Sequence, residues 1–145
     1  MLPGEIYRDA RFYVAVTGEP KAKYLHVLAT PKNDDIVARL LTSLPRGRPE
    51  TPPCYHGAPY GGYFLGIPGA PLTQETWVDL RYLDDLDPDD FRKRETKGIL
   101  SRVARLPVDL LREILRCVAE DDDTTRQEDR HLRDAIDALP NSTTC

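Results

Sequence analysis

The stretch that decides the fold is residues 98–118, GILSRVARLPVDLLREILRCV, because its periodicity changes at one proline. The side chains of 99–106 alternate between two faces, as in a strand. From Val108 onward, apolar residues recur at helical spacing. Pro107 suits a first helical position, where its missing N–H would be unpaired anyway, and Asp109 favours the positive end of the helix dipole. The stretch therefore predicts a strand that delivers an amphipathic helix onto a sheet.

The composition is that of an ordinary globular domain. The chain has 145 residues, of which 40% are hydrophobic and 30% charged, which is enough for one domain with a sizeable core. The sequence contains no apolar run of membrane-spanning length. Residues 1–5 lack the basic-then-apolar pattern of a signal peptide. We therefore expect a cytoplasmic protein with no membrane partner.

The three cysteines, Cys54, Cys117 and Cys145, stand at unrelated spacings. Cys117 lies on or beside the apolar face of the predicted helix and is interpreted as a small core residue. Cys54 and His56 are both of metal-ligating types, but no second pair follows at zinc-ligand spacing. The sequence therefore predicts no metal site.

Short β-rich segments separated by turn signals fill much of the chain. The candidate strands are 5–8, 11–17, 24–30, 63–67 and 76–83, with residues 9–10 as a tight connection between the first two. The pattern of 36–44 favours a short helix, with an edge strand as the alternative, and Asp87 begins a capped helical turn. Together these segments predict a mainly-β (α+β) fold, a small and strongly bent antiparallel barrel closed by the C-terminal amphipathic helix.

The C-terminal segment 120–145 is acidic. It holds eight acids against three arginines, a net charge of −5, so the remaining 119 residues carry +1 of the total of −4. Leu132, Ile136 and Leu139 predict a last helix within it. We therefore divide the chain into a domain of residues 1–119 and a helical or flexible tail. The tail is either solvated or lies across a basic groove in the place of RNA.

Three polar side chains could form a phosphodiester site at the mouth of the sheet. Arg11 stands at the start of one strand, Thr30 at the end of its expected neighbour, and His26 shares a face with Thr30. A guanidinium there would stabilise phosphorane charge while a second group moved a proton. The alternatives are a solvated arginine, a packed histidine and an ordinary strand end.

Residues 45–62 form a long loop without periodicity, which usually marks either function or disorder. Its basic and aromatic side chains suit single-stranded RNA, through charge and base stacking. The candidate RNA-binding residues are Arg46, Arg48, Tyr55, His56 and Tyr60. The same composition also suits an ordinary proline-rich loop.

Several short motifs, in order along residues 4–118, resemble the MazF/PemK/Kid family of toxins. The strand 11–17 is similar to the family's RPvvVlS strand, with Phe12 in place of proline. The other similar motifs are Gly4-Glu5-Ile6-Tyr7 (GEIY), Val27-Leu28-Ala29-Thr30 (the strand ending in PlT), Leu80-Arg81-Tyr82-Leu83-Asp84 (irtiD), and Lys97-Gly98-Ile99-Leu100 with Leu106-Pro107-Val108-Asp109-Leu110 (GrLspeeL).

The resemblance implies an SH3-like barrel, usually a homodimer, that cleaves single-stranded RNA as a metal-independent endoribonuclease without a cofactor. A cognate antitoxin protein would occupy the RNA groove. Arg11 matches the catalytic arginine of the family and Thr30 its active-site threonine. Asp79 lies nearest to an aspartate that contributes in the Kid branch.

Two function classes are therefore weighed. The first is a ribonuclease toxin of a toxin–antitoxin pair. The second is a non-catalytic barrel that acts as a protein-interaction or RNA-binding module, which the near-neutral body and acidic tail favour.

Overall fold

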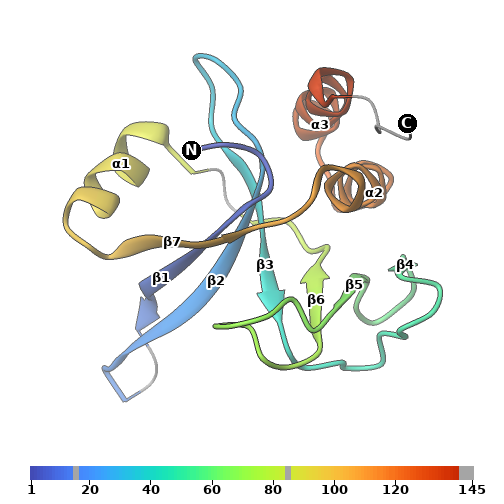
Figure 1. Cartoon of the computed structure of the whole chain (residues 1–145), viewed down its shortest axis with the longest axis horizontal. Helices are drawn as coiled ribbons and strands as arrows, with labels where there is room; N and C mark the ends of the chain where they lie inside the picture. Colours follow the sequence, from blue (N-terminus) through green and yellow to red (C-terminus); the bar gives the residue numbers. More distant parts are fainter. Residues whose placement is uncertain (15–16, 84–85, 141–145) are drawn as a thin grey trace.

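A computed structural model describes residues 1–14, 17–83 and 86–140 as an antiparallel sheet with three helices (Figure 1). The elements are β1 (Glu5–Val14), β2 (Pro20–Ala29), β3 (Val37–Thr42), β4 (Cys54–Tyr55), β5 (Gly62–Gly66), β6 (Thr76–Asp79), α1 (Pro88–Thr96), β7 (Leu100–Arg105), α2 (Val108–Ala119) and α3 (Arg126–Ala138). The strand order is β4-β5-β6-β3-β2-β1-β7. The mainly-β, α+β class is confirmed, but the sheet stays open, with β4 and β7 at its edges, and does not close into a barrel.

The strand–helix unit predicted over residues 99–118 is confirmed. β7 pairs with β1 and leads through Pro107, the N-cap residue, into α2. Helix α2 buries the stripe expected from its periodicity, including Leu111, Ile114 and Leu115. Figure 1 shows α2 and α3 together at one end of the sheet, with α1 at the other.

Side-chain alternation along the strands divides the core into two parts. On β1, Ile6 packs in the larger cluster with α2, whereas its neighbour Tyr7 packs in the smaller cluster with Phe91 of α1. The Tyr7 and Phe91 rings meet edge-on, with centroids 4.9 Å apart. Because successive side chains of a strand point to opposite faces, α1 covers one face of the sheet and α2 with α3 cover the other.

The predicted connection at residues 9–10 is wrong. β1 continues through it, and its pairing with β2 shifts in register between Asp9 and Tyr13. The Asp9 carboxylate is fully buried, accepts a hydrogen bond from the backbone N–H of Arg11 at 3.0 Å, and pairs with Arg94 of α1. A buried acid that organises a bulge thus takes the place of a turn. Residues 15–16 of the predicted strand 11–17 lie outside the described residues.

The short helix predicted over 36–44 is also wrong, because β3 occupies this segment. β3 lies between β2 and β6, so it is a central strand and not the edge strand of the alternative. Val37 and Leu41 point to one face of the sheet and Ala38 to the other, and all three are buried, so β3 is covered on both faces. A strand buried on both faces lacks clean alternation, and its apolar residues can match helical spacing.

β6 ends at Asp79, short of the predicted 76–83, and Asp84 lies outside the described residues.

Helix α3, predicted within the acidic tail, is confirmed and packs against α2. It begins with a capping box between Thr125 and Glu128, and Leu132 is fully buried in the main core. Glu128 is buried as well and receives two hydrogen bonds from Arg39 of β3, at 2.9 and 3.0 Å. Residues 126–138 therefore share the core of the sheet domain. Within the described residues, no helix is long and apolar enough to span a bilayer.

Breaking the Arg39–Glu128 pair should strongly destabilise the fold. Glu128→Gln keeps the shape of the side chain and its capping role but leaves the buried guanidinium without a countercharge. We expect a loss of about 3–5 kcal/mol in the free energy of unfolding, measured by urea titration. Asp129→Asn, which removes the exposed pair with Arg133, is the control and should cost at most about 1 kcal/mol. Equal losses in both variants would contradict the role given to Glu128.

Candidate functional site

The phosphodiester site expected between Arg11 and Thr30 does not form. Arg11 lies on β1 beyond the point where Asp9 pairs with Lys23, whereas Thr30 follows the other end of β2. Seven residues of extended chain, about 23 Å, separate Lys23 from Thr30. The expectation that the guanidinium and the hydroxyl meet is therefore wrong.

His26 is not available to a substrate either. Its side chain is fully buried in the sheet, and this burial lowers its pKa to about 4. The ring is therefore neutral at physiological pH and has no path to solvent-borne RNA. The interpretation of His26 as a packed core histidine is the one that the fold supports.

Asp79, in contrast, lies at the centre of a charged cluster at the end of β6. The residue is 4% exposed, and its carboxylate accepts hydrogen bonds from Nε and Nη2 of Arg81 at 2.7–3.1 Å. Nη2 of Arg48 lies 3.4 Å from the same carboxylate. Burial alone would raise the pKa of Asp79, but the hydrogen bonds and charge of Arg81, with the charge of Arg48, hold this pKa below its usual value. Asp79 is thus an anion at neutral pH and pairs with two guanidinium groups.

Arg48, predicted to bind RNA, is instead a buried support for the loop. Its Nε donates to the carbonyl of Gly61 at 2.8 Å and its Nη1 donates to the carbonyl of Leu44 at 3.1 Å. Burial lowers the pKa of Arg48, while the charge of Asp79 acts in the opposite direction. A Cβ on Gly62 would lie 2.5 Å from Cδ of Arg48, so the absence of a side chain there is what lets the arginine enter.

The turn before Arg48 directs Arg46 outward. Arg46 and Gly47 have φ values of 47° and 87°, and the N–H of Arg48 donates to the carbonyl of Pro45 at 2.8 Å. Positive φ at both central positions is the signature of a type I′ turn. Arginine is an unusual residue for this conformation, which costs of order 1 kcal/mol or more. The tight turn holds an exposed guanidinium beside the buried one.

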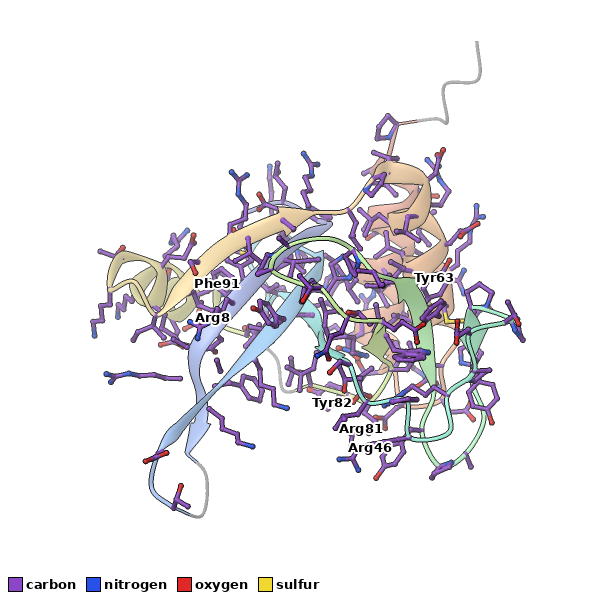
Figure 2. All side chains as sticks on the ribbon, turned by 60° about the horizontal axis from the view of Figure 1, so that its bottom comes forward. Arg8, Arg46, Tyr63, Arg81, Tyr82 and Phe91 are labelled. Carbon is purple, nitrogen blue, oxygen red and sulfur yellow. A yellow bond between two sulfur atoms is a disulfide. The ribbon has the colours of Figure 1, made fainter. Side chains whose placement is uncertain are left out.

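Tyr60 brings three arginines together. The guanidinium carbons of Arg81, Arg48 and Arg46 lie 4.9, 5.3 and 5.8 Å from the centroid of its ring. Each distance is within cation–π range. Figure 2 shows Arg46, Arg81 and Tyr82 on one side of the molecule. We call the surface formed by the exposed Arg46, Arg81 and Tyr82 with the half-buried Tyr60 the Arg/Tyr patch.

A small pocket adjoins the patch. Its volume is about 150 Å³, and its walls are Leu40, Asp79, Arg81, Tyr82 and Leu83. The Arg81 side chain is 59% exposed and the Tyr82 residue 38% exposed at its rim. The pocket therefore combines apolar and aromatic walls with a carboxylate and a guanidinium, which suits a flat polar ring better than a purely apolar ligand.

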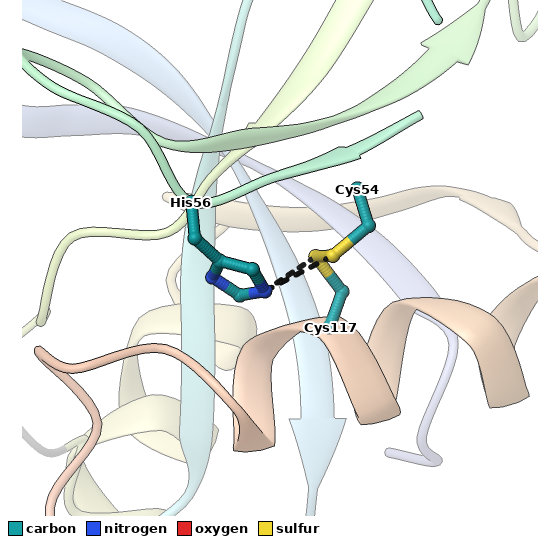
Figure 3. A group of neighbouring side chains, drawn as sticks. All are labelled: Cys54, His56 and Cys117. Atoms are coloured by element: carbon teal, nitrogen blue, oxygen red, sulfur yellow. Dashed lines mark hydrogen bonds between the residues drawn. A yellow bond between two sulfur atoms is a disulfide. The ribbon is translucent and has the colours of Figure 1, made fainter. Parts of the chain in front are cut away.

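Tyr55 and His56 stand apart from these cation–π contacts. Tyr55 follows Cys54 on β4, and His56 lies beside a disulfide (Figure 3). β4 carries Cys54, which is bonded to Cys117 of α2 with a Cα–Cα distance of 5.8 Å. Nε2 of His56 lies 3.2 Å from the Cys54 sulfur, and Nδ1 lies 3.2 Å from Oδ1 of Asp121. The sequence correctly placed Cys117 in the core but gave no sign that it meets Cys54. Cys145 lies outside the described residues.

Comparisons of the chain with protein-family models, with curated proteins and with solved structures found no match.

The sequence analysis missed Arg81 and Tyr82 as site residues. Both belong to the motif Leu80-Arg81-Tyr82-Leu83-Asp84, which predicted a family resemblance but no role for either side chain. The available signal was the pair Asp79 and Arg81, because residues two apart on a strand lie on the same face. Loss of strand pairing after Asp79 also frees this segment to form the pocket wall.

Asp79→Asn should lower the free energy of unfolding and make this free energy less dependent on pH in acid. Without the carboxylate, Arg48 remains buried with no countercharge, at a cost of about 3–5 kcal/mol near neutral pH. Because its folded pKa is lowered, Asp79 stabilises the fold above its unfolded pKa of about 3.9 and loses this effect as the pH falls through the folded value. Urea unfolding at pH 7 and pH 3 should therefore show a smaller loss on acidification in the variant. If Asp79→Asn lost as much unfolding free energy between pH 7 and pH 3 as the unsubstituted protein, the role given to Asp79 would be contradicted. Asp129→Asn is the control and should keep the pH dependence of the unsubstituted protein.

Proposed function

We propose that this chain is a binding module for single-stranded RNA, with the Arg/Tyr patch as its contact surface. The observation that carries the proposal is the convergence of three guanidinium groups on the ring of Tyr60. Asp79 neutralises one of the three positive charges, and the Asp123 carboxylate, which accepts a hydrogen bond from the Tyr82 N–H, acts on Arg81, so the cluster keeps a local excess of about one. Such an excess in a near-neutral domain provides a localised site for phosphate.

The chemistry of the patch suits unpaired nucleotides. Arg46 and Arg81 are exposed and can bind phosphate oxygens, while Tyr82 offers a partly exposed ring. Bases stack on aromatic rings and on guanidinium planes only where they are unstacked from one another, as they are in single strands. The adjoining pocket, walled by Leu40, Tyr82 and Leu83 with Arg81 at its rim, can receive the flat face of a base.

Arg46→Ala should weaken the binding of a labelled single-stranded RNA, measured by fluorescence anisotropy. Loss of one charged hydrogen-bond donor to phosphate predicts a roughly tenfold weaker affinity. The slope of log affinity against log salt should fall in magnitude by about 0.7 for each phosphate contact removed. Arg46 is the residue of choice because it lies outside the Asp79 ion pairs.

Arg133→Ala is the matched control, since it also removes an exposed arginine, on α3, and should leave the affinity unchanged. Equal effects of the two substitutions would show a diffuse charge effect and contradict the patch. Undetectable RNA binding by the unsubstituted protein at low salt would reject the proposal outright.

The second candidate is the endoribonuclease toxin implied by the resemblance to the MazF/PemK/Kid family. One observation favours it: Asp79, the candidate catalytic aspartate, lines the pocket together with Arg81. There Arg81 could stabilise the charge of a phosphorane during attack by the ribose 2′-hydroxyl. This proposal also includes four further expectations of the family. They are an SH3-like origin of the open sheet, a cognate antitoxin, a homodimer and a cytoplasmic location. Arg11 and Thr30 would not act together in it.

Cleavage distinguishes the two candidates. In the presence of EDTA, the toxin proposal predicts discrete fragments from a long single-stranded RNA, and Arg81→Ala should remove most of this activity. The binding-module proposal predicts intact RNA with a measurable affinity. Gel electrophoresis of the RNA over a range of protein concentrations reads out both results, with Arg133→Ala as the control variant.

A further inference from the structure

The group formed by Cys54, His56 and Cys117 has the composition of a metal site. One ligand atom from each residue, two sulfurs and a ring nitrogen, lies within 4.8 Å of the others (Figure 3). Strand β4 supplies Cys54, the loop after it supplies His56, and α2 supplies Cys117. The two sulfurs are joined as a disulfide, so the group can act on a metal only after reduction.

We propose that, once this disulfide is reduced, Cys54, Cys117 and Nε2 of His56 bind one zinc ion. Zinc prefers thiolate and imidazole ligands in tetrahedral geometry. With bonds of about 2.3 Å to sulfur and 2.05 Å to nitrogen, a tetrahedral site places each sulfur about 3.6 Å from the nitrogen. Nε2 of His56 already lies 3.2 Å from the Cys54 sulfur and 3.9 Å from the Cys117 sulfur.

Asp121 provides an independent indication of a metal site. Its Oδ1 lies 3.2 Å from Nδ1 of His56, in the connection between α2 and α3. A carboxylate that accepts the Nδ1–H of a histidine fixes the tautomer whose Nε2 lone pair faces the metal. This is the usual partner of a zinc-binding histidine, and it holds the ring with Nε2 toward the two sulfurs. His56 is also 35% exposed in its side chain, which gives an ion a path in and leaves the fourth position to water.

A dithiol reductant transfers two electrons and two protons to the disulfide, which becomes two protein thiols while the reductant becomes a disulfide. The S–S bond breaks, and rotation about the Cα–Cβ bonds can open the sulfurs to the distance of about 3.8 Å that two zinc ligands require. Zinc then replaces the two thiol protons, which are released to solvent without electron transfer.

The site would connect the same two segments as the disulfide. Cys54 and Cys117 are 63 residues apart, and their bond attaches the loop of residues 45–62 to α2. In a compartment that keeps thiols reduced, the metal would maintain this attachment in place of the covalent bond. The inference is independent of RNA binding, because the Arg/Tyr patch contributes none of the three ligands.

The test is a cobalt titration of the full chain carrying Cys145→Ser, first reduced with a dithiol that is then removed anaerobically. We expect one Co²⁺ per chain with thiolate-to-cobalt absorption bands, displaced by Zn²⁺, and no such bands from the oxidised protein. His131→Ala is the matched control, because His131 also pairs with an aspartate, Asp34, at 2.9 Å, but was not part of the predicted ligand set. It should bind as the unsubstituted protein does.

Substitutions separate the ligands from their neighbours. Asp121→Asn should weaken the affinity about 10-fold to 100-fold, and His56→Ala should weaken it further. Cys54→Ser and Cys117→Ser should abolish the thiolate bands, with circular dichroism to check that each variant is folded. Absence of the bands in the reduced unsubstituted protein, or an unchanged affinity in His56→Ala, would overturn the proposal. Both of these results are independent of how the cysteine variants fold.

Discussion

The site depends on one buried carboxylate, that of Asp79, shared by two arginines. A buried charge is costly unless it is paired, and Asp79 is paired with both Arg48 and Arg81. Arg48 in turn binds backbone carbonyls on both sides of the long loop, at Leu44 and Gly61. The carboxylate at the end of β6 therefore determines where the loop lies and, through Arg81 and Tyr60, where positive charge gathers on the surface.

A second attachment, the disulfide to α2, also holds the loop of residues 45–62. The Cys54–Cys117 bond links the middle of the loop to α2, and His56 with Asp121 extends this link to the α2–α3 connection. The segment 45–62, predicted as a loop without regular structure, contains the short strand β4 and ends at the first residue of β5, and ordering its remaining residues would otherwise cost substantial conformational entropy. Arg48 and Cys54 divide it into short segments, so that Tyr60 can hold a fixed position among the arginines. The order of a proline-rich segment thus comes from tertiary contacts and not from local periodicity.

The elements with clear local signals could be predicted from the sequence, whereas those that depend on distant partners could not. The alternation before Pro107 marks β7, and the apolar stripe after it marks α2. Asp87 with Pro88 marks the start of α1. β3 was mistaken because burial on both faces removes the alternation that marks a strand. The pairing of Asp9 with Arg94, and of Arg39 with Glu128, spans most of the chain, so no local pattern reveals either. The same reason explains why Asp79, Arg48 and Tyr60 were named separately without being recognised as one cluster, and why Arg11 and Thr30 were wrongly joined.

The most direct test is a nuclear magnetic resonance titration that follows the side-chain Nε–H signals of the arginines while single-stranded RNA is added. The signals of Arg46 and Arg81 should shift in proportion to saturation. The signal of Arg48 should remain protected from solvent exchange throughout, because its Nε–H donates to the carbonyl of Gly61 in the interior. Shifts confined to arginines elsewhere, such as Arg8 or Arg102, or rapid solvent exchange of the Arg48 Nε–H, would contradict the account.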